Sequence, residues 1–527
     1  MKPSAPSQAP LESHVESVLE PALEPALEPA LEPALEPAVE PAVEPAAARR
    51  PSAPLYKQIA EHYRSTMVSG ALRPGDRMPS VRAMMRQHAV SLSTALQVCR
   101  YLEREGWLEA KARSGYFVRR ATAVALPASS EPDAMRVDPA QYVGMHAGIS
   151  AIINRQHQFP DALNLGGATA APELYATQLL KNSALRALRH APELLTTYGS
   201  HQGNLAFRRV LARRALTARI HVAPEDVIVT HGGIEAVNLA LRAVAQPGDV
   251  VAVDSPTFFG LLQVLESLGM RALEIPTSPT TGLSLEALAL AIETYSNIKA
   301  VVVVPNLQNP LGSIMPDAHK GQLIQLCAQH GIAVIEDDPY RELSDRATPL
   351  KAAKAWDEEG NVIYCASLNK TLAPGMRLGW MAAGRWLERV RMLKFAQSRH
   401  NEEWPQIVAA DFMGSPAYDR HLARLREQLR QQRERTADAI AAYFPSGTRM
   451  TRPDGGLLLW VELPGQIDTQ VVFEQALTLG IRIAPGAMFS NSNRYARFLR
   501  ISCGAPYTAE LDHALRKLGQ MIVALSL

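Results

Sequence analysis

Short apolar runs rich in valine and isoleucine recur in the second half of this 527-residue chain and constrain what it can fold into. Helix-like stretches separate the runs, which lie at 227–230, 250–254, 300–305, 332–336 and 362–366. Strands that are apolar at every position are buried on both faces, and strands separated by helices pair in parallel. Residues 161–527 are therefore expected to form an α/β domain with a mainly parallel sheet. A long charged helical region should follow from Arg377 to Tyr443, and a smaller α/β portion from Gly455 onward.

Polar and glycine-containing segments follow these runs, at the edge of the sheet where ligands of open α/β folds bind. After the first run, Gly232 and Gly233 precede an expected helix at 237–245, where backbone amides can approach a phosphate. The later runs are followed by an aromatic ring, an amide, and a carboxylate with a phenol, supplied by Phe258, Asn309, Asp337 and Tyr340. Each has a simpler alternative, because Phe258 could be core, Asn309 a turn former and Asp337 a helix cap.

The last run ends in Ser367, which is followed by Lys370 and Arg377. A lysine amine kept from water is partly neutral and can form an imine with an aldehyde. A hydroxyl and a guanidinium on either side would suit a phosphate. For an isolated lysine, an exposed position at a strand end is the simpler interpretation. Arg500, within the apolar run 498–502, would be costly to bury without a partner, although an ordinary ion pair would suffice.

Four segments taken in order resemble those of fold-type I pyridoxal-phosphate (PLP) enzymes of the aminotransferase kind, over about residues 165–525. They are NPLG at 309–312, EDDPY at 336–340, SLNKTLAPGMR at 367–377 and FLRIS at 498–502. The resemblance implies the PLP-dependent transferase fold with PLP as cofactor, and no metal. It implies that Lys370 forms the internal aldimine, that Asp337 pairs with the pyridine nitrogen, and that Arg500 binds the substrate carboxylate.

The resemblance also assigns supporting roles. Lys370, Asp337 and Tyr340 would be the catalytic residues. The expected contacts are Tyr340 and Asn309 with the phenolic oxygen, Phe258 with the ring, Gly233, Ile234, Ser367 and Arg377 with the phosphate, and Gly167 and Asn309 with the substrate. Tyr198 would reach the phosphate of a neighbouring subunit, which implies a homodimer. Two positions depart from the family: Ile234 replaces a frequent polar residue, and Asn369 replaces a common serine before the lysine.

Charge is distributed unevenly along the chain, although the net charge is only +2. Residues 51–120 hold twelve Lys and Arg against five Asp and Glu, whereas residues 1–50 hold nine Glu against three basic residues. The rest of the chain is nearly neutral. A compact basic segment beside a neutral body suggests that one small domain binds a polyanion.

Residues 52–120 are expected to form a small domain with three helices and a hairpin around a basic turn, which makes a winged helix-turn-helix. Its segments LRPGDRMPSVR and SGYFV resemble the GntR family of DNA-binding domains. The resemblance implies contacts with double-stranded DNA from Arg82, Ser91, Ser93, Thr94, Arg113 and Gly115. Phosphate contact is favoured for Arg82 and Arg113, whereas Ser91 is at least as well explained as a helix cap.

Two segments lack the pattern of a packed domain. Within residues 1–50 a Leu-Glu-Pro-Ala repeat places proline at every fourth position, which prevents helix and sheet formation and predicts a disordered acidic tail. This tail either has no specific role or competes with DNA for the basic domain. Residues 121–160 are expected to be a linker, flexible over 121–139, with a short helix at 142–153 docking on the following domain.

Composition excludes several classes of protein. No stretch approaches the ~18 uninterrupted apolar residues of a membrane span, and the first residues lack the apolar core of a signal peptide. The four cysteines are far apart, so neither a disulfide framework nor a zinc site is expected. We therefore expect a cytoplasmic protein with no membrane partner.

A GntR-like domain, a linker and an aminotransferase-like domain in one chain resemble the MocR subfamily of bacterial transcription regulators. The resemblance implies a PLP-dependent, dimeric regulator in the bacterial cytoplasm, on the nucleoid when it binds operator half-sites. It would sense an amino acid or amine effector through aldimine exchange at Lys370. The alternative is a working aminotransferase acting on an amino acid, with DNA binding secondary or lost.

Overall fold

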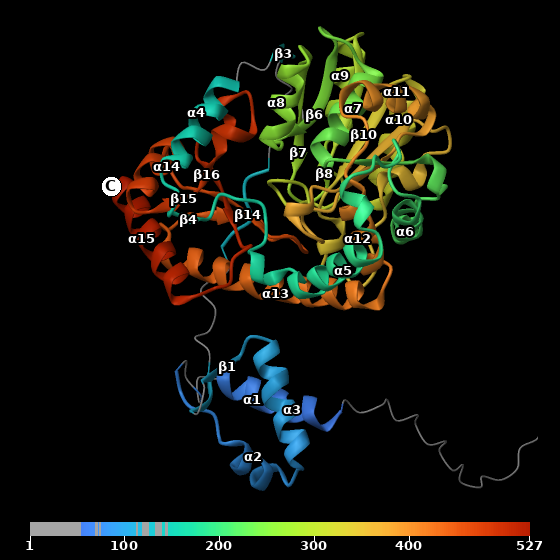
Figure 1. The fold of residues 1–527 in the computed structure, drawn as a ribbon. Coiled ribbons are helices and arrows are strands. Elements are labelled where there is room, and N and C mark those ends of the chain that lie inside the picture. Colours follow the sequence, from blue (N-terminus) through green and yellow to red (C-terminus); the bar gives the residue numbers. More distant parts are fainter. Residues whose placement is uncertain are drawn as a thin grey trace, which may run out of the picture. The chain divides into compact units, whose positions relative to one another are not determined.

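The computed structural model describes residues 54–68, 72, 75–111, 114–118, 126–131, 140–142 and 146–526 (Figure 1). The chain divides into two compact units, Met1–Leu72 with Arg77–Tyr116, and Arg73–Asp76 with Phe117–Leu527. The acidic repeat at 1–50 lies outside the described residues. In the part that is described, no helix combines the length and apolar character needed to cross a membrane.

The small unit is a winged helix-turn-helix, as expected. Its elements are α1 (Leu55–Val68), α2 (Val81–His88), α3 (Leu92–Arg104), β1 (Leu108–Lys111) and β2 (Gly115–Val118), whose last two residues fall beyond the unit boundary at Tyr116. The apolar positions of α3 face inward, because Ala95, Val98, Cys99 and Leu102 are all buried. The Ser80 side chain accepts a hydrogen bond from the Ala83 N–H, and the Ser91 side chain accepts one from the Thr94 N–H. These caps fix where α2 and α3 begin.

The large unit contains a nine-stranded sheet in the order β3-β7-β6-β9-β10-β11-β12-β5, with β8 paired to β7. The bounds are β3 (Gln141–Tyr142), β5 (Val227–Thr230), β6 (Val250–Ser255), β7 (Arg271–Ser278), β8 (Gly282–Leu283), β9 (Ile298–Val303), β10 (Ala333–Asp338), β11 (Val362–Ser367) and β12 (Gly379–Ala382). The central pairs from β7 to β11 are parallel, whereas β12 is antiparallel to both of its neighbours. The expected fold class is confirmed. The five apolar runs correspond to β5, β6, β9, β10 and β11, and the sheet also contains β3, β7, β8 and β12, which the apolar runs did not indicate.

Helices cover both faces of this sheet, and alternate strand residues serve the two faces. Val251 and Val253 pack with α7 (Gly233–Val244), α8 (Phe259–Ser267) and α11 (Leu387–Gln397). Val250 and Ala252 pack instead with α9 (Leu285–Thr294) and α10 (Asp317–Gln329). Toward the β5 end of the sheet, α6 (Leu205–Ala215) and α12 (Glu403–Met413) cover the sheet, and α5 (Thr177–His190) packs on α12.

The expectation of a continuous helical region from Arg377 to Tyr443 is wrong at its start. The four residues of β12 intervene, and the helical part divides into α11, α12 and α13 (Pro416–Tyr443). β12 passes so close to the start of α7 that a Cβ at Gly379 would lie 2.6 Å from the Gly232 carbonyl carbon. Such a short strand has no period long enough to distinguish it from a loop.

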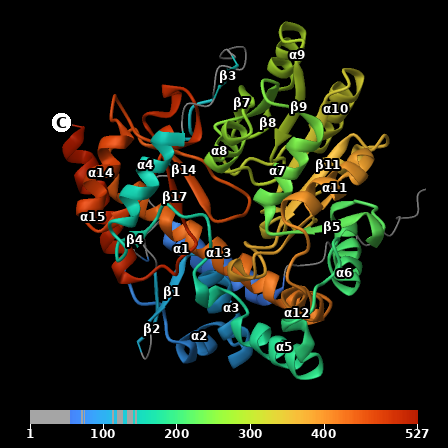
Figure 2. The same cartoon turned by 45° about the horizontal axis from the view of Figure 1, so that its top comes forward.

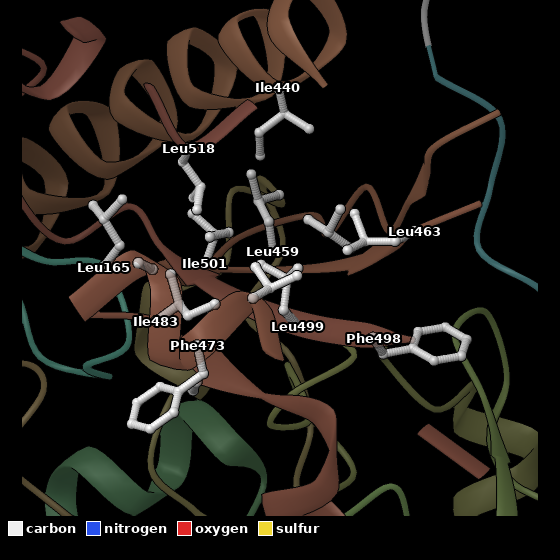
Figure 3. Close-up of a cluster of buried hydrophobic side chains, with 14 of the residues drawn as sticks. Leu165, Ile440, Leu459, Leu463, Phe473, Ile483, Phe498, Leu499, Ile501 and Leu518 are labelled. Atoms are coloured by element: carbon white, nitrogen blue, oxygen red, sulfur yellow. The ribbon is translucent and has the colours of Figure 1, made fainter. Parts of the chain in front are cut away.

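A second lobe, called here the C-terminal lobe, is built on a four-stranded sheet in the order β13-β14-β17-β16. Its elements are β13 (Arg449–Met450), β14 (Leu458–Glu462), β15 (Ile481–Arg482), β16 (Ala484–Pro485), β17 (Phe498–Ser502), α14 (Thr469–Thr478), α15 (Ala509–Leu525), α4 (His146–His157) and β4 (Leu163–Asn164). Figure 3 shows side chains from the strands meeting Ile440, Phe473 and Leu518 in its core. The rest of the large unit, built on the nine-stranded sheet, is called here the large lobe. α13 joins the two lobes (Figure 1; Figure 2), because its first half packs in the large lobe and Ile440 packs in the C-terminal lobe.

The range 121–160, expected to be a linker, is partly built into the large unit. Ile149 and Ile152 of α4 belong to the core of the C-terminal lobe, so the expected docking helix exists but runs four residues later at each end. β3 pairs with β7 at the edge of the large sheet. Residues 126–131 are also described and contact the C-terminal lobe.

We expect Phe473→Ala to destabilise the large unit by about 3–5 kcal/mol, because the ring is fully buried and its loss leaves a cavity. Val471→Ala, on the same helix but 46% exposed, should change the free energy of unfolding by less than about 0.5 kcal/mol. Urea denaturation followed by circular dichroism measures both. Equal effects of the two substitutions would contradict the assignment of Phe473 to the core.

Candidate functional site

The carboxyl ends of β10 and β11 and the start of α7 converge on one site. Asp337 pairs in register with Cys365, so it lies two residues from Ser367 along the neighbouring strand. A Cβ added to Gly233 would lie 3.2 Å from the Ser367 Cβ and 3.6 Å from an Asp337 carboxylate oxygen. The sheet thus brings together three residues that are distant in sequence, and only a small residue fits at Gly233.

Lys370 follows this edge in the loop after β11. Its Nζ lies 3.4 Å from the Thr169 hydroxyl and 5.9 Å from the centre of the Tyr340 ring. Burial, and then the positive charge of Arg500, lower the pKa of the Lys370 amine to about 8, against the opposing effect of Asp337. Roughly a tenth of the amine is therefore neutral at pH 7, a far larger fraction than for an ordinary lysine.

Asp337 and Tyr340 are perturbed mainly by burial. Burial, reinforced by the charge of Asp338, raises the pKa of Asp337 to about 7, although Lys370 acts in the opposite direction. Within the described part of the chain, no group donates a hydrogen bond to the Asp337 carboxylate. Burial raises the pKa of the Tyr340 phenol to about 12, so this hydroxyl keeps its proton at neutral pH. The Asp337 carboxylate thus offers the site a hydrogen-bond acceptor, and the Tyr340 hydroxyl offers a donor.

Arg500 is the most deeply buried charge of the site, with only 2% of its surface exposed. Its guanidinium donates to the Asn309 side-chain oxygen at 2.8 Å and to the Gly166 carbonyl at 2.5 Å. Burial lowers the pKa of Arg500 to about 10, so it remains charged at neutral pH. Its Nε has no partner among the described residues, and none of their carboxylates is paired with it. A buried cation in this state attracts an anionic ligand.

The start of α7 can receive a second anion. Gly232 has a positive φ of 83°, and a Cβ there would lie 3.4 Å from an Arg377 guanidinium nitrogen and 3.3 Å from the Asn369 amide nitrogen. Arg377 also donates to the His231 carbonyl at 3.4 Å. Because the Ile234 side chain has no polar atom, any hydrogen bond to an anion there comes from its backbone N–H. A helix N-terminus with an adjacent guanidinium and hydroxyl suits a phosphate.

Three further expected site residues make their contacts with other neighbours in the described part of the chain. Phe258 precedes α8, and its ring centre lies 4.8 Å from that of Phe259. Tyr198 is 89% exposed and makes an edge contact with His400. The Gly167 N–H donates to the Asn164 side chain at 2.9 Å, one residue from the carbonyl that Arg500 binds.

Sequence reasoning missed Thr169 and Tyr175, which contact the loop that carries Lys370. Besides Thr169, the Tyr175 hydroxyl donates to the Asn369 carbonyl at 3.2 Å, directly before Lys370. A cavity of about 510 Å³ opens beside this loop, with largely apolar walls and Lys181 as its charged lining residue. The segment 164–176 has no apolar period, so only the glycine pair at 166–167 offered a signal.

The small unit presents basic and hydroxyl side chains on α2, α3 and the wing. Arg82 is exposed on α2. The Ser91 hydroxyl caps α3 and also bonds the Ser93 and Thr94 hydroxyls at 2.8 and 2.9 Å, so the capping interpretation holds for it. Gly115 has a φ of 98°, and a Cβ there would lie 3.7 Å from the guanidinium of Arg77, which the sequence analysis overlooked. Arg113 lies outside the described residues.

Comparisons with known proteins agree with this geometry. The aminotransferase class I and II family model matches residues 171–518, and the gntR family of bacterial regulatory proteins matches residues 55–118. The Escherichia coli K12 proteins YjiR and YdcR, both described as uncharacterized HTH-type transcriptional regulators, are 35% and 34% identical to this chain. Each alignment covers 89% of this chain and 98% of the relative.

Two solved aminotransferases resemble the large unit. Kynurenine aminotransferase from Pyrococcus horikoshii, in complex with PMP, has a TM-score of 0.67 at 26% identity, over 72% of this chain and 95% of its own. The α-aminoadipate aminotransferase LysN from Thermus thermophilus, complexed with N-(5'-phosphopyridoxyl)-L-leucine, has a TM-score of 0.66 at 26% identity, over 71% and 95%.

We expect an amine-reactive reagent to label Lys370, in protein freed of bound aldehydes, with a midpoint near pH 8. The labelling rate should rise about fivefold from pH 7 to pH 8 and level off above roughly pH 9, because only the neutral amine reacts. Asp337→Asn should move the midpoint to lower pH, since the carboxylate favours the charged amine. Peptide mass spectrometry measures the rate. A rate still rising tenfold per pH unit beyond pH 9 would contradict the lowered pKa.

Proposed function

This chain belongs to the MocR subfamily of GntR-type transcription regulators, and from that premise we propose that it is a PLP-dependent regulator whose DNA affinity responds to an amino compound. The observation that carries the proposal is the buried Arg500 guanidinium beside a lysine whose pKa is lowered. The guanidinium is suited to a carboxylate, and the partly neutral lysine amine is suited to form an imine with an aldehyde cofactor.

The residues at the sheet edge fit the cofactor that this family implies. Lys370 would bind it covalently, and Asp337, to which no described residue donates a hydrogen bond, would pair with its ring nitrogen. The phenolic oxygen, the ring and the phosphate would be held by Tyr340, Asn309, Phe258, Gly233, Ile234, Ser367 and Arg377. When bound, PLP supplies an aldehyde that condenses reversibly with primary amines and a ring that withdraws electrons.

The chain's own groups define what the ligand must carry. Arg500 offers a bidentate fork to a carboxylate, and Asn309 and Gly166 hold that fork in place. We propose that the ligand's amine takes the position of the Lys370 amine while its carboxylate binds Arg500. The ligand can alter DNA binding only if it binds more tightly to one arrangement of the chain than to another.

We further propose a homodimer in the cytoplasm that binds paired operator half-sites. The exposed Tyr198 ring, which among the described residues finds only His400 as an aromatic neighbour, supports a role toward a second subunit. Two winged helices per dimer require two half-sites, with spacing set by how the domains are mounted.

Transamination is the second candidate, favoured by the complete set of Lys370, Asp337, Tyr340 and Arg500 at one site. Steady multiple turnover of an amino acid with a keto acid, together with no specific footprint on DNA upstream of its own gene, would support the enzyme over the regulator. A specific footprint without turnover would support the regulator.

We expect Lys370→Ala to abolish the visible absorbance of lysine-bound PLP and to leave non-specific DNA binding at low salt unchanged, because the winged helix is a separate unit. Lys370→Arg retains the charge and should also lose the absorbance, which isolates the covalent bond as its cause. Absorbance spectra after addition of PLP and gel-shift titrations measure the two properties. Unchanged absorbance in Lys370→Ala would contradict the assignment.

We expect Arg82→Ala and Arg77→Ala each to lower DNA affinity about tenfold for all sequences, since phosphate contacts carry no sequence information. Each should also reduce the slope of log K against log salt by about 0.9, the value for one phosphate contact. Arg64→Ala is the matched control, because Arg64 on α1 is already paired with Glu61. Fluorescence anisotropy at several salt concentrations measures the slopes. A slope unchanged from wild type would remove Arg82 or Arg77 from the interface.

A further inference from the structure

Residues 126–131 belong to the range expected to be a flexible connector, yet they are held on the C-terminal lobe. The Pro127 carbonyl accepts the Met450 N–H at 3.0 Å. The Ser130 N–H and hydroxyl both donate to the Glu462 carboxylate, at 2.7 and 2.6 Å. The preceding residue, Ser129, is 6% exposed. These contacts attach the segment through both its backbone and its side chains.

Glu462 makes this attachment specific. It is 4% exposed at the end of β14, and Arg497 pairs with it at 2.7 Å. Arg449 donates to the Ser130 hydroxyl at 3.2 Å. A buried carboxylate is costly unless its oxygens are hydrogen-bonded, and two of its donors come from Ser130. Releasing the segment would therefore leave a buried charge partly unsatisfied.

The attachment lies on the same pair of strands as Arg500. Glu462 on β14 pairs in register with Phe498 on β17, and Trp460 pairs with Arg500. The rings of Trp460 and Phe498 stack with centres 5.4 Å apart and planes 15° apart. Glu462 and Arg500 therefore lie on two hydrogen-bonded neighbouring strands of the same sheet.

The chain is held a second time before it enters α4. The Ala140 N–H donates to the Tyr295 hydroxyl at 3.2 Å, and Gln141 pairs with Ala272 at the edge of the large sheet. The segment is therefore fastened to the C-terminal lobe at 126–131 and to the large lobe at 140–142.

We propose that residues 126–131 are a fixed anchor, so that the tether of the DNA-binding domain is residues 119–125 alone rather than the whole linker. The eight peptide steps from Val118 to Leu126 span at most roughly 28 Å, whereas a free chain from Val118 to Ala140 would span roughly 75 Å. The anchor thus leaves a shorter stretch of chain between the DNA-binding domain and the lobe that carries Arg500. Any consequence for DNA rests on the proposed function, whereas the anchor itself does not.

Two insertions of the same ten-residue Gly-Ser sequence test the tether, one after residue 122 and one after residue 135. The first lengthens the tether and should increase the radius of gyration of the full chain, measured by small-angle X-ray scattering. The second lies between the two points of attachment and should change it less than half as much. Equal increases, or no increase from the first insertion, would overturn the proposal without any reference to DNA or cofactor.

The same two proteins test the consequence for DNA. The insertion after residue 122 should broaden the range of half-site spacings that are bound within tenfold of the best affinity, and the insertion after 135 should leave that range as in wild type. Equal broadening by both would overturn the anchor as the determinant of spacing. Absence of specific binding in wild type would overturn the proposed function and leave the scattering result standing.

Hydrogen exchange tests the anchor contacts directly. Glu462→Gln should speed exchange of the Ser130 amide by about tenfold to a hundredfold, the range for losing a bond to a charged acceptor. Ser130→Ala, which leaves the lobe's own residues intact, should speed exchange of the Met450 amide. Glu510→Gln, an exposed carboxylate of the same lobe, is the control and should change neither. Unchanged exchange in both test variants would overturn the anchor.

Discussion

The buried guanidinium of Arg500 is the constraint on which the site depends. It lies within a strand whose neighbouring residues are apolar and buried, and the groups that satisfy it are an amide oxygen and a carbonyl rather than a carboxylate. Neutral acceptors offset only part of the cost of burying a cation. The remainder is available to a ligand, and this residual attraction distinguishes a binding site from a structural ion pair such as Arg341 with Asp338.

The large sheet brings together the other groups of the site, which come from distant parts of the chain. Parallel pairing of β9, β10 and β11 places Asp337 and Ser367 at one edge, and the close passage of β12 beneath Gly232 sets the start of α7 against them. Arg500 comes from the other lobe and reaches the site through Asn309 on a loop of the large lobe. The site therefore contains groups from both lobes, and the distances between these groups depend on how the two lobes are placed.

Much of this can be predicted from the sequence, for reasons that also explain the failures. The strands β5, β6, β9, β10 and β11 are predictable within about two residues because each contains a run of apolar residues. Asp337 and Arg500 are predictable because each is a charged residue inside a strand, and Lys370 because it follows a strand closely. β12 escapes prediction because four residues between glycine and alanine show no period. Thr169, Tyr175 and the anchor at 126–131 depend on tertiary contacts with no local pattern: Glu462 has the appearance of an ordinary charged residue at a strand end.

The pKa shifts of Asp337 and Lys370 make the stability of the fold change with pH in opposite directions. Asp337 keeps a proton in the fold up to about pH 7 that the unfolded chain loses near pH 4, so between these values its contribution to stability falls as pH rises. Lys370 releases its proton in the fold near pH 8 but near pH 10.5 when unfolded, so above pH 8 its contribution rises with pH. Between pH 7 and 8 both groups are largely charged when nothing pairs with them, and there these two groups contribute least to the stability of the fold. A bound group that pairs with Asp337 and engages the Lys370 amine removes both penalties, and a ligand that binds only the folded state stabilises it further. Occupation of the site therefore relieves the unfavourable burial of these two charges most between pH 7 and 8.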